Sequence, residues 1–385
     1  MHLITVKLEE VFQALADRTR IRIMRLLVDT GEEICLCELV DSLQELQYKL
    51  SRHLKTLRQA GLLTTIKDGR SWTADLVALC VGVKPNSQLA SAAGLAVGPK
   101  GHIITDAAMR TADPDIFALG DVVEVMDPVF GTPTAVPLAG PANRQGRIVA
   151  DNLLGGSRRY EGTFGASVVK VGKLTAASCG HTEARLKAMG KTYQKVYVHA
   201  GSHAGYYPGA TTLHIKLLFG NDGQIYGGQV IGAEGADKRT YVLATAMRAG
   251  MTVRQLAELE LCYAPPFSST KDPITVAGMI ATNALDSATR LAHADALPEG
   301  ALLLDVREPA ECEKGTLPGA VTIPLGQLRN RLEELPRDRL IITYCAVGLR
   351  GYLAERILRQ NGFDVRNLSG GFTTWRFFQH TSPSR

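Results

Sequence analysis

The sequence predicts a multidomain protein that combines α/β and α+β folds. Its 385 residues exceed the usual size of one domain, so we expect several. Apolar residues recur at helical spacing in the N-terminal part, whereas short β-branched runs alternate with helical patterns in the C-terminal part. We expect four domains, over residues 1–74, 75–155, 156–284 and 285–385.

The composition excludes several classes of protein. Apolar residues make up 45% and charged residues 21%, which is typical of soluble globular chains and argues against a disordered one. No apolar run reaches the ~18 residues of a membrane span, and no basic-then-apolar signal segment opens the chain. Seven cysteines without regular spacing argue against a secreted disulfide framework. We therefore expect a cytoplasmic protein with no membrane partner.

The N-terminal segment, residues 1–74, reads as three helices and a β-hairpin. The third helix is expected over residues 47–60, with an apolar stripe of Leu50, Leu54 and Leu57. Residues 47–70 carry six Lys or Arg against one acid. Asp-Gly at positions 68 and 69 predicts the hairpin tip. This order predicts a winged helix-turn-helix, and the alternative is a small helical domain with a solvated charged face.

In a winged helix-turn-helix, the basic helix enters the major groove of DNA and the wing approaches phosphate. The predicted DNA-binding residues are Gln47, Lys49, Ser51, Arg52, His53, Lys67 and Arg70.

Residues 5–73 resemble the arsenic-repressor (ArsR/SmtB) family through the stretches 14–20, 33–39 and 50–57. The resemblance implies that Cys35 and Cys37 bind arsenite or another thiophilic ion and so release DNA, and thiolates do select soft metals. A third thiol often completes such a site, but Val40 stands at a plausible position for it. The alternative is a pair of structural cysteines.

The second segment, residues 75–155, opens on an apolar run at 76–81 that predicts a strand. Two later stretches, 111–121 and 136–146, resemble the flavin-dependent pyridine nucleotide–disulfide oxidoreductases, in particular coenzyme A disulfide reductases with a rhodanese tail. The resemblance implies that one pair of residues meets the ribityl chain of FAD and that a helix start lies against the flavin ring. These implied FAD contacts are Gly120 and Asp121 for the chain, and Pro137, Leu138 and Ala139 for the ring.

The third segment, residues 156–284, resembles the dimerisation domain of the same family. Strands are expected at 213–219 and 224–232 around an Asn-Asp-Gly turn, with helices at 238–248 and 252–259. The resemblance implies a homodimer in which Tyr207 and Tyr263 come near the coenzyme A disulfide site. The alternative is that both tyrosines serve packing.

A full enzyme of this family seats the flavin pyrophosphate on a Gly-x-Gly-x-x-Gly turn before a helix. This motif is absent from the whole sequence. We therefore predict a truncated reductase segment that binds no flavin of its own. The alternative is that a separate full-length reductase subunit supplies the flavin in trans.

The fourth segment, residues 285–385, carries the chemistry. An apolar strand at 340–342 leads into the loop Thr343–Arg350, and a helix is expected over 351–360, where Leu353, Ile357 and Leu358 recur at helical spacing. A cysteine at such a strand-to-helix turn meets unpaired backbone N–H groups and the positive helix end. Together with Arg350, these groups favour the nucleophilic thiolate of Cys345.

Residues 287–380 resemble a rhodanese (sulfurtransferase) domain, with a doubly wound parallel sheet. The resemblance rests on the Cys-x-x-Gly-x-Arg loop, the strands 302–306 and 317–324 and the Gly-Gly-Phe-x-x-Trp tail. It implies that Cys345 carries a persulfide, that Asp305 and Arg307 shape the pocket floor, and that loop amides hold the sulfur. The loop residues are Ala346, Val347, Gly348 and Leu349. The alternative is a catalytically inactive copy.

The predicted function is therefore sulfur transfer at Cys345, from a sulfane-sulfur donor to a thiol acceptor such as coenzyme A. The alternative is an ArsR-type transcriptional regulator that releases DNA on binding arsenite or a sulfur species.

Overall fold

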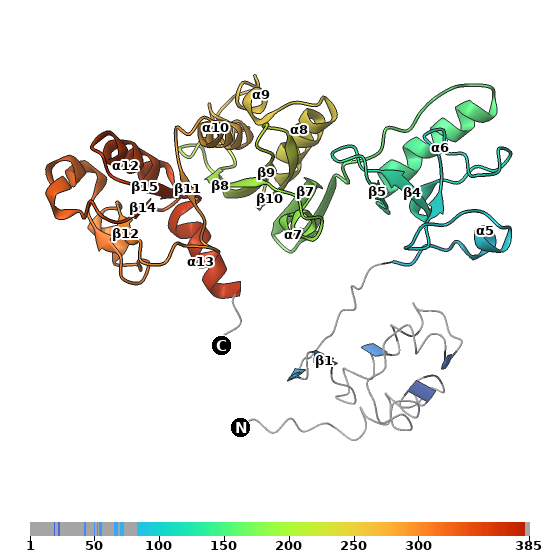
Figure 1. Ribbon diagram of the computed structural model, residues 1–385, viewed down its shortest axis with the longest axis horizontal. Helices are drawn as coiled ribbons and strands as arrows, with labels where there is room; N and C mark the ends of the chain where they lie inside the picture. Colours follow the sequence, from blue (N-terminus) through green and yellow to red (C-terminus); the bar gives the residue numbers. More distant parts are fainter. Residues whose placement is uncertain are drawn as a thin grey trace. The chain divides into compact units, whose positions relative to one another are not determined.

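The computed structural model describes residues 83–381 and part of the N-terminal segment, and it divides the chain into two compact units at residue 84 (Figure 1). In the first unit the described residues are Thr19, Arg22, Ile23, Ser42, Leu43, Leu50, Arg52, Leu54, Lys55, Thr65–Lys67 and Arg70–Trp72. The predicted strand at 76–81 and the residues Gln47, Lys49, Ser51, His53, Cys35 and Cys37 lie outside the described residues.

The described part of the first unit agrees with two of the sequence predictions. Leu50 and Leu54 are helical and buried, while Arg52 and Lys55 are helical and exposed. Strands β1 (Thr65–Lys67) and β2 (Arg70–Trp72) pair antiparallel, with Lys67 opposite Arg70. The amphipathic third helix and the hairpin are thus confirmed at these positions, but they do not by themselves make a winged helix-turn-helix.

Residues 83–155 form a small layer around a three-stranded sheet of order β3-β4-β5. Its elements are α5 (Gln88–Ala92), β3 (Ile103–Ile104), the 3-10 turn η1 (Gly120–Val122), β4 (Val123–Met126), β5 (Pro133–Thr134) and α6 (Ala139–Leu153). A modest core of residues such as Met109, Val123 and Val149 holds it together. Large apolar side chains remain exposed on it, at Val83, Leu89, Val97, Ile104, Ile116, Leu119, Met126, Leu153 and Leu154.

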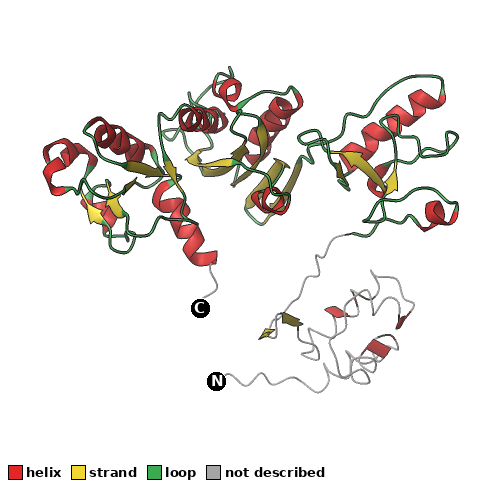
Figure 2. Ribbon diagram, viewed as in Figure 1, coloured by secondary structure: helices red, strands yellow, loops and turns green. Residues whose placement is uncertain are grey.

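The dimerisation segment is an α+β layer with an antiparallel five-stranded sheet of order β6-β7-β10-β9-β8 (Figure 2). The strands are β6 (Ser167–Val171), β7 (Leu174–Gly180), β8 (Gln194–Gly201), β9 (Thr212–Phe219) and β10 (Ile225–Gly232). The helices are α7 (Glu183–Ala188), α8 (Ala236–Arg248), α9 (Val253–Ala257) and α10 (Pro273–Leu285). Gly223 adopts φ +85 at the predicted turn between β9 and β10, which explains why glycine stands there.

The helices α8 and α10 cover one face of this sheet and bury a single apolar core with it. The strands and the helix α8 match the sequence prediction to within two residues. The helix predicted at 252–259 is shorter in the structure, where α9 spans Val253–Ala257.

The C-terminal domain has an all-parallel sheet of order β11-β15-β14-β12-β13, as the doubly wound prediction requires. The strands are β11 (Leu291–Ala292), β12 (Leu302–Asp305), β13 (Val321–Thr322), β14 (Ile341–Tyr344) and β15 (Val365–Leu368). The helical elements are α11 (Pro309–Cys312), η2 (Leu325–Asn330), η3 (Leu332–Glu334), α12 (Leu349–Gln360) and α13 (Gly371–Thr381). Alternate residues of β14 enter separate apolar clusters, since Ile341 packs in one and Ile342 in the other. Both faces of the sheet are therefore covered.

One sequence expectation for this domain needs correction, the start of the helix after Cys345. Within that helix Ile357 and Leu358 are buried, and Leu353 is 43% exposed. The helix α12 begins at Leu349, two residues earlier than expected, because Gly348 at φ +114 serves as its N-cap. Leu349 and Arg350 therefore belong to the first helical turn.

Candidate functional site

The candidate site lies where β14 ends and α12 begins. Cys345 directly follows the last residue of β14 and is only 1% exposed. The backbone N–H of Gly348 donates a hydrogen bond to the Cys345 sulfur over 3.2 Å. The sulfur thus occupies the concave side of a tight loop, where an amide already points at it. This is the arrangement that stabilises a sulfur anion.

The four residues that follow Cys345 differ in exposure. Val347 and Leu349 are exposed, Ala346 is half-buried and Gly348 is buried. The loop therefore turns the Gly348 amide toward the sulfur and the side chains of Val347 and Leu349 toward solvent.

The first turn of α13 supports the backbone of the Cys345 loop. Phe372 and Thr373 donate their backbone N–H groups to the carbonyl oxygens of Cys345 and Ala346, over 2.8 and 3.0 Å. A Cβ at Gly371, where φ is +57, would stand 2.3 Å from the Cys345 carbonyl oxygen. Glycine is required there because the helix start approaches the loop backbone so closely. The Gly-Gly-Phe tail thus supports the sulfur loop directly.

Arg350 does not stand free beside the sulfur. It donates two hydrogen bonds to the carboxylate of Glu311, over 2.6 and 2.7 Å, and both side chains are about one-third exposed. The pairing with Arg350 lowers the pKa of Glu311 to about 2, and the hydrogen bonds to Glu311, with a smaller contribution from Cys345, raise the pKa of Arg350. The predicted cation is therefore present, but its charge is shared with an acid that sequence reasoning missed.

Glu311 stands in α11, three residues after Glu308, whose backbone N–H it accepts in a capping box. The three-residue spacing of Glu308 and Glu311 is the sequence feature that could have predicted a carboxylate in a fixed position. The sequence alone did not show that this carboxylate faces Arg350, since 39 residues separate the two.

Asp305 and Arg307 form a buried ion pair beneath the loop. Arg307 donates to Asp305 through Nη2 over 2.6 Å, and the two residues are 3% and 0% exposed respectively. Arg307 also donates to the carbonyl oxygen of Gly315, and its guanidinium lies 4.3 Å from the Phe372 ring centroid. Arg307 therefore links the turn after α11 to α13, the helix whose first turn supports the loop. This burial favours a supporting role rather than contact with substrate.

The two stretches with implied flavin contacts come together at the start of α6. Gly120 donates its backbone N–H to the side chain of Gln145 over 2.7 Å, which fastens η1 to the second turn of that helix. Asp121, Pro137 and Ala139 are exposed, and Leu138 is half-buried. Leu138 and Ala139 border an open cavity of about 720 Å³. The surfaces that would meet the ribityl chain and the ring are thus present, and they are open.

Tyr207 and Tyr263, predicted to lie near the disulfide site of a dimer, have different partners within one chain. Tyr263 shares a 3.2 Å hydroxyl–hydroxyl hydrogen bond with Tyr206, whereas Tyr207 stacks edge-on against His203. Tyr206 was missed because it stands next to Tyr207 in the sequence, and residue type alone does not distinguish neighbours in a loop. Both members of the observed pair are exposed, so they are accessible to a ligand.

No group of three or more His, Cys, Asp or Glu among the described residues is placed to hold a metal ion. Cys35 and Cys37, the predicted thiophilic site, lie outside those residues. Within the described part of the chain, none of the helices combines the length and apolar character needed to traverse a bilayer.

Three family models match stretches of the chain. The model for the pyridine nucleotide-disulphide oxidoreductases matches residues 27–146, that for their dimerisation domain matches 166–273, and the rhodanese-like model matches 288–377. None of these three is a winged helix-turn-helix family, and the first match begins inside the segment that resembles the arsenic repressors. The chain is thus similar to pyridine nucleotide-disulphide oxidoreductases over two stretches and to rhodanese-like domains over a third.

Several known proteins are similar to parts of this chain. Coenzyme A disulfide reductase of Staphylococcus epidermidis is 38% identical over 56% of this chain and 49% of its own length, and that of Staphylococcus aureus is 35% identical over 61% and 53%. Reduced Bacillus anthracis CoADR-RHD is 46% identical over 80% of this chain and 57% of its own, with a TM-score of 0.77. The NAD-dependent persulfide reductase of A. fulgidus is 39% identical over 81% and 58%, with a TM-score of 0.74. The chain spans about half the length of the curated relatives it matches.

Proposed function

We propose that the chain is a rhodanese-type sulfurtransferase that carries sulfane sulfur on Cys345. The observation that carries the proposal is the hydrogen bond from the Gly348 amide to the Cys345 sulfur, at the end of a buried strand. The terminal sulfur of a persulfide is an anion, and amides that point at a developing anion stabilise it. The Glu311–Arg350 pair borders the same loop and keeps a cation beside it.

The reaction is a pair of sulfur displacements. The Cys345 thiolate attacks the outer sulfur of a donor R–S–S⁻, the S–S bond of the donor breaks, and the thiolate RS⁻ leaves with the bonding electrons. An acceptor thiolate then attacks the outer sulfur of the Cys345 persulfide, which releases the Cys345 thiolate again. No net electrons enter or leave the protein.

The acceptor class follows from the relatives. Their names attach coenzyme A disulfides and persulfides to chains with these domains, so we propose a small thiol such as coenzyme A as the acceptor. The exposed Tyr206–Tyr263 pair in the dimerisation segment is a candidate contact for it, in a homodimer formed through that segment. Sulfur loading of the intact protein tests the function: incubation with thiosulfate should add the mass of one sulfur atom, and cyanide should remove it.

We further propose that this chain alone binds no stoichiometric flavin. The exposed start of α6 and η1 offer contacts to the ribityl chain and the ring only, and no Gly-x-Gly-x-x-Gly turn stands anywhere in the sequence for the pyrophosphate. Its charges would lose water without replacement hydrogen bonds, at about 1–3 kcal/mol for each unmet group.

The flavin proposal predicts a colourless protein. After incubation with excess FAD and desalting, the visible spectrum should show far less than one flavin per chain. A yellow protein with one flavin per chain would contradict it. The alternative, that a full-length reductase subunit supplies the flavin, is tested by adding such a reductase. If it supplies flavin to this chain, the amount of bound flavin should rise in proportion to the amount of this chain.

A second proposed function is DNA binding by the N-terminal unit. It is supported by the described helical residues, where Leu50 and Leu54 are buried and Arg52 and Lys55 are exposed, and by the β1–β2 pairing. About four phosphate contacts would give a log–log salt slope near −4. Fluorescence anisotropy with duplex DNA from upstream of the gene measures this slope. Arg52→Ala should weaken binding and the control Lys100→Ala should not; no binding at low salt would refute the proposal.

A further inference from the structure

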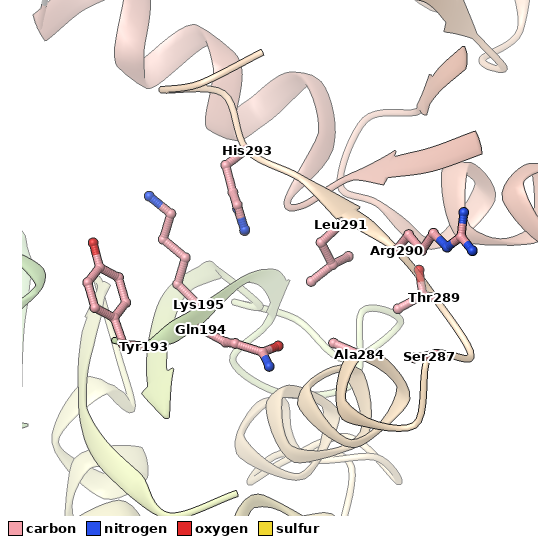
Figure 3. Close-up of a pocket in the computed structure, with 9 residues that line it drawn as sticks. All are labelled: Tyr193, Gln194, Lys195, Ala284, Ser287, Thr289, Arg290, Leu291 and His293. Carbon is pink, nitrogen blue, oxygen red and sulfur yellow. The ribbon is translucent and has the colours of Figure 1, made fainter. Parts of the chain in front are cut away.

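The rhodanese-like domain contacts the outer face of the dimerisation sheet. Alternate residues of the edge strand β8 make these contacts. Lys195 is bonded to Asp295 over 2.6 Å, the Tyr197 amide donates to Ser369 Oγ over 3.0 Å, and His199 Nε2 lies 2.7 Å from Thr374 Oγ1. A strand turns alternate side chains to one face, so Lys195, Tyr197 and His199 all point toward the rhodanese-like domain. A cleft of about 420 Å³ opens beside Lys195 and His293 (Figure 3).

The contact at His199 is built from two histidines. His199 and His214 stand opposite each other on β8 and β9, and their Nδ1 atoms are 2.8 Å apart. One of these nitrogens must donate and the other accept, which requires at least one neutral ring. Phe377 of α13 stacks edge-on against both rings. The two histidines therefore contact α13 in two ways: His199 forms a hydrogen bond with Thr374, and both rings pack against Phe377.

The helix α13, which the two histidines contact, is also the helix that supports the Cys345 loop. Thr374 stands in the first turn of α13, immediately after Phe372 and Thr373, whose amides bind the carbonyl oxygens of Cys345 and Ala346. Gly370 lies at the junction: a Cβ there would stand 2.0 Å from Thr374 Oγ1 and 3.0 Å from His199 Nε2. One helical turn thus contacts the sulfur loop on one side and the dimerisation sheet on the other.

We propose that His199, acting through Thr374, is a positioning residue for the Cys345 loop. By fixing the first turn of α13 against the dimerisation sheet, it holds the amides that set the loop carbonyls, and with them the direction of the Gly348 amide toward the sulfur. The inference rests on the proposed sulfurtransferase function for its activity measurement only.

The site gives this contact a pH dependence. Burial, with the charge of His214, lowers the pKa of His199 to about 4 from its ordinary 6.5, and burial lowers the pKa of His214. The next outward residue on β9 is the cation Lys216, and the acid Glu183 beyond it is already bonded to Lys195 and Lys216. Burial also lowers the pKa of His293, at the same interface, to about 4, so docking is complete above about pH 6.5 and weakens as the pH falls toward 4, by up to about tenfold per pH unit for each of His199 and His293.

The experiment compares His199→Phe and Thr374→Val with Thr374→Ser, which keeps the hydroxyl, and with His293→Phe, a histidine that stacks against Tyr197 at the same interface. Hydrogen exchange over residues 369–376 reports the amides of Phe372 and Thr373 without any turnover. We expect exchange there to rise about tenfold or more in the first two variants and to stay unchanged in the last two.

Turnover supplies the second measurement. The acid limb of kcat/KM for thiosulfate below pH 6.5 should flatten in His199→Phe and Thr374→Val, with a lower plateau, and should persist in Thr374→Ser. Unchanged exchange and an unchanged acid limb in both variants would overturn the inference. A wild-type protein that takes up no sulfur would refute the proposed function instead, and the exchange measurement would still decide the positioning role.

Discussion

Cys345→Ser is expected to abolish sulfur uptake and to lower turnover by about 10³-fold or more, because a serine hydroxyl neither forms a persulfide nor ionises near neutral pH. The sulfur of Cys345 is buried and receives the Gly348 amide, so the smaller oxygen occupies the same cradle without disturbing the fold. Intact-mass measurement after incubation with thiosulfate checks the uptake, and a thiocyanate assay with cyanide as acceptor checks the turnover.

The matched control is Cys262→Ser, at an exposed thiol in the dimerisation segment. It should leave both measurements unchanged. If Cys345→Ser still gains one sulfur atom and turns over normally, another thiol carries the sulfur and the assignment of the site is wrong.

Asp305→Ala is expected to destabilise the rhodanese-like domain by about 3–5 kcal/mol, the usual cost of removing one partner from a buried ion pair. Arg307 would remain buried with three of its hydrogen bonds to that carboxylate lost. Because Arg307 also packs on Phe372, the loop support should loosen with it. Urea unfolding followed by Trp375 fluorescence, in a Trp72→Phe background, reports this domain.

The control for this prediction is Glu334→Gln, which removes a carboxylate from the solvent-exposed Arg331–Glu334 pair. Exposed pairs contribute little to stability, so its midpoint should scarcely move. A midpoint for Asp305→Ala equal to that of Glu334→Gln would show that the buried pair is not structural.

Local patterns were sufficient for much of the fold. The apolar run before Cys345 predicted the strand β14, the rhodanese resemblance implied the parallel sheet around it, and the Asn-Asp-Gly turn predicted the pairing of β9 with β10. These predictions succeed because side-chain periodicity and turn chemistry are short-range properties. The boundary of α12 was missed by two residues, since the left-handed conformation of Gly348 that starts it depends on the packing of the whole loop.

By itself, then, the sequence determined the residue types and their order: a cysteine on a strand-to-helix turn, a glycine pair before Phe372, and no pyrophosphate-binding glycine turn. Only the tertiary structure decided which distant groups meet. Glu311 reaches Arg350, Tyr206 rather than Tyr207 reaches Tyr263, and His199 reaches Thr374, 175 residues away. The physical reason is that such contacts depend on how elements pack across long sequence separations, which no local periodicity records.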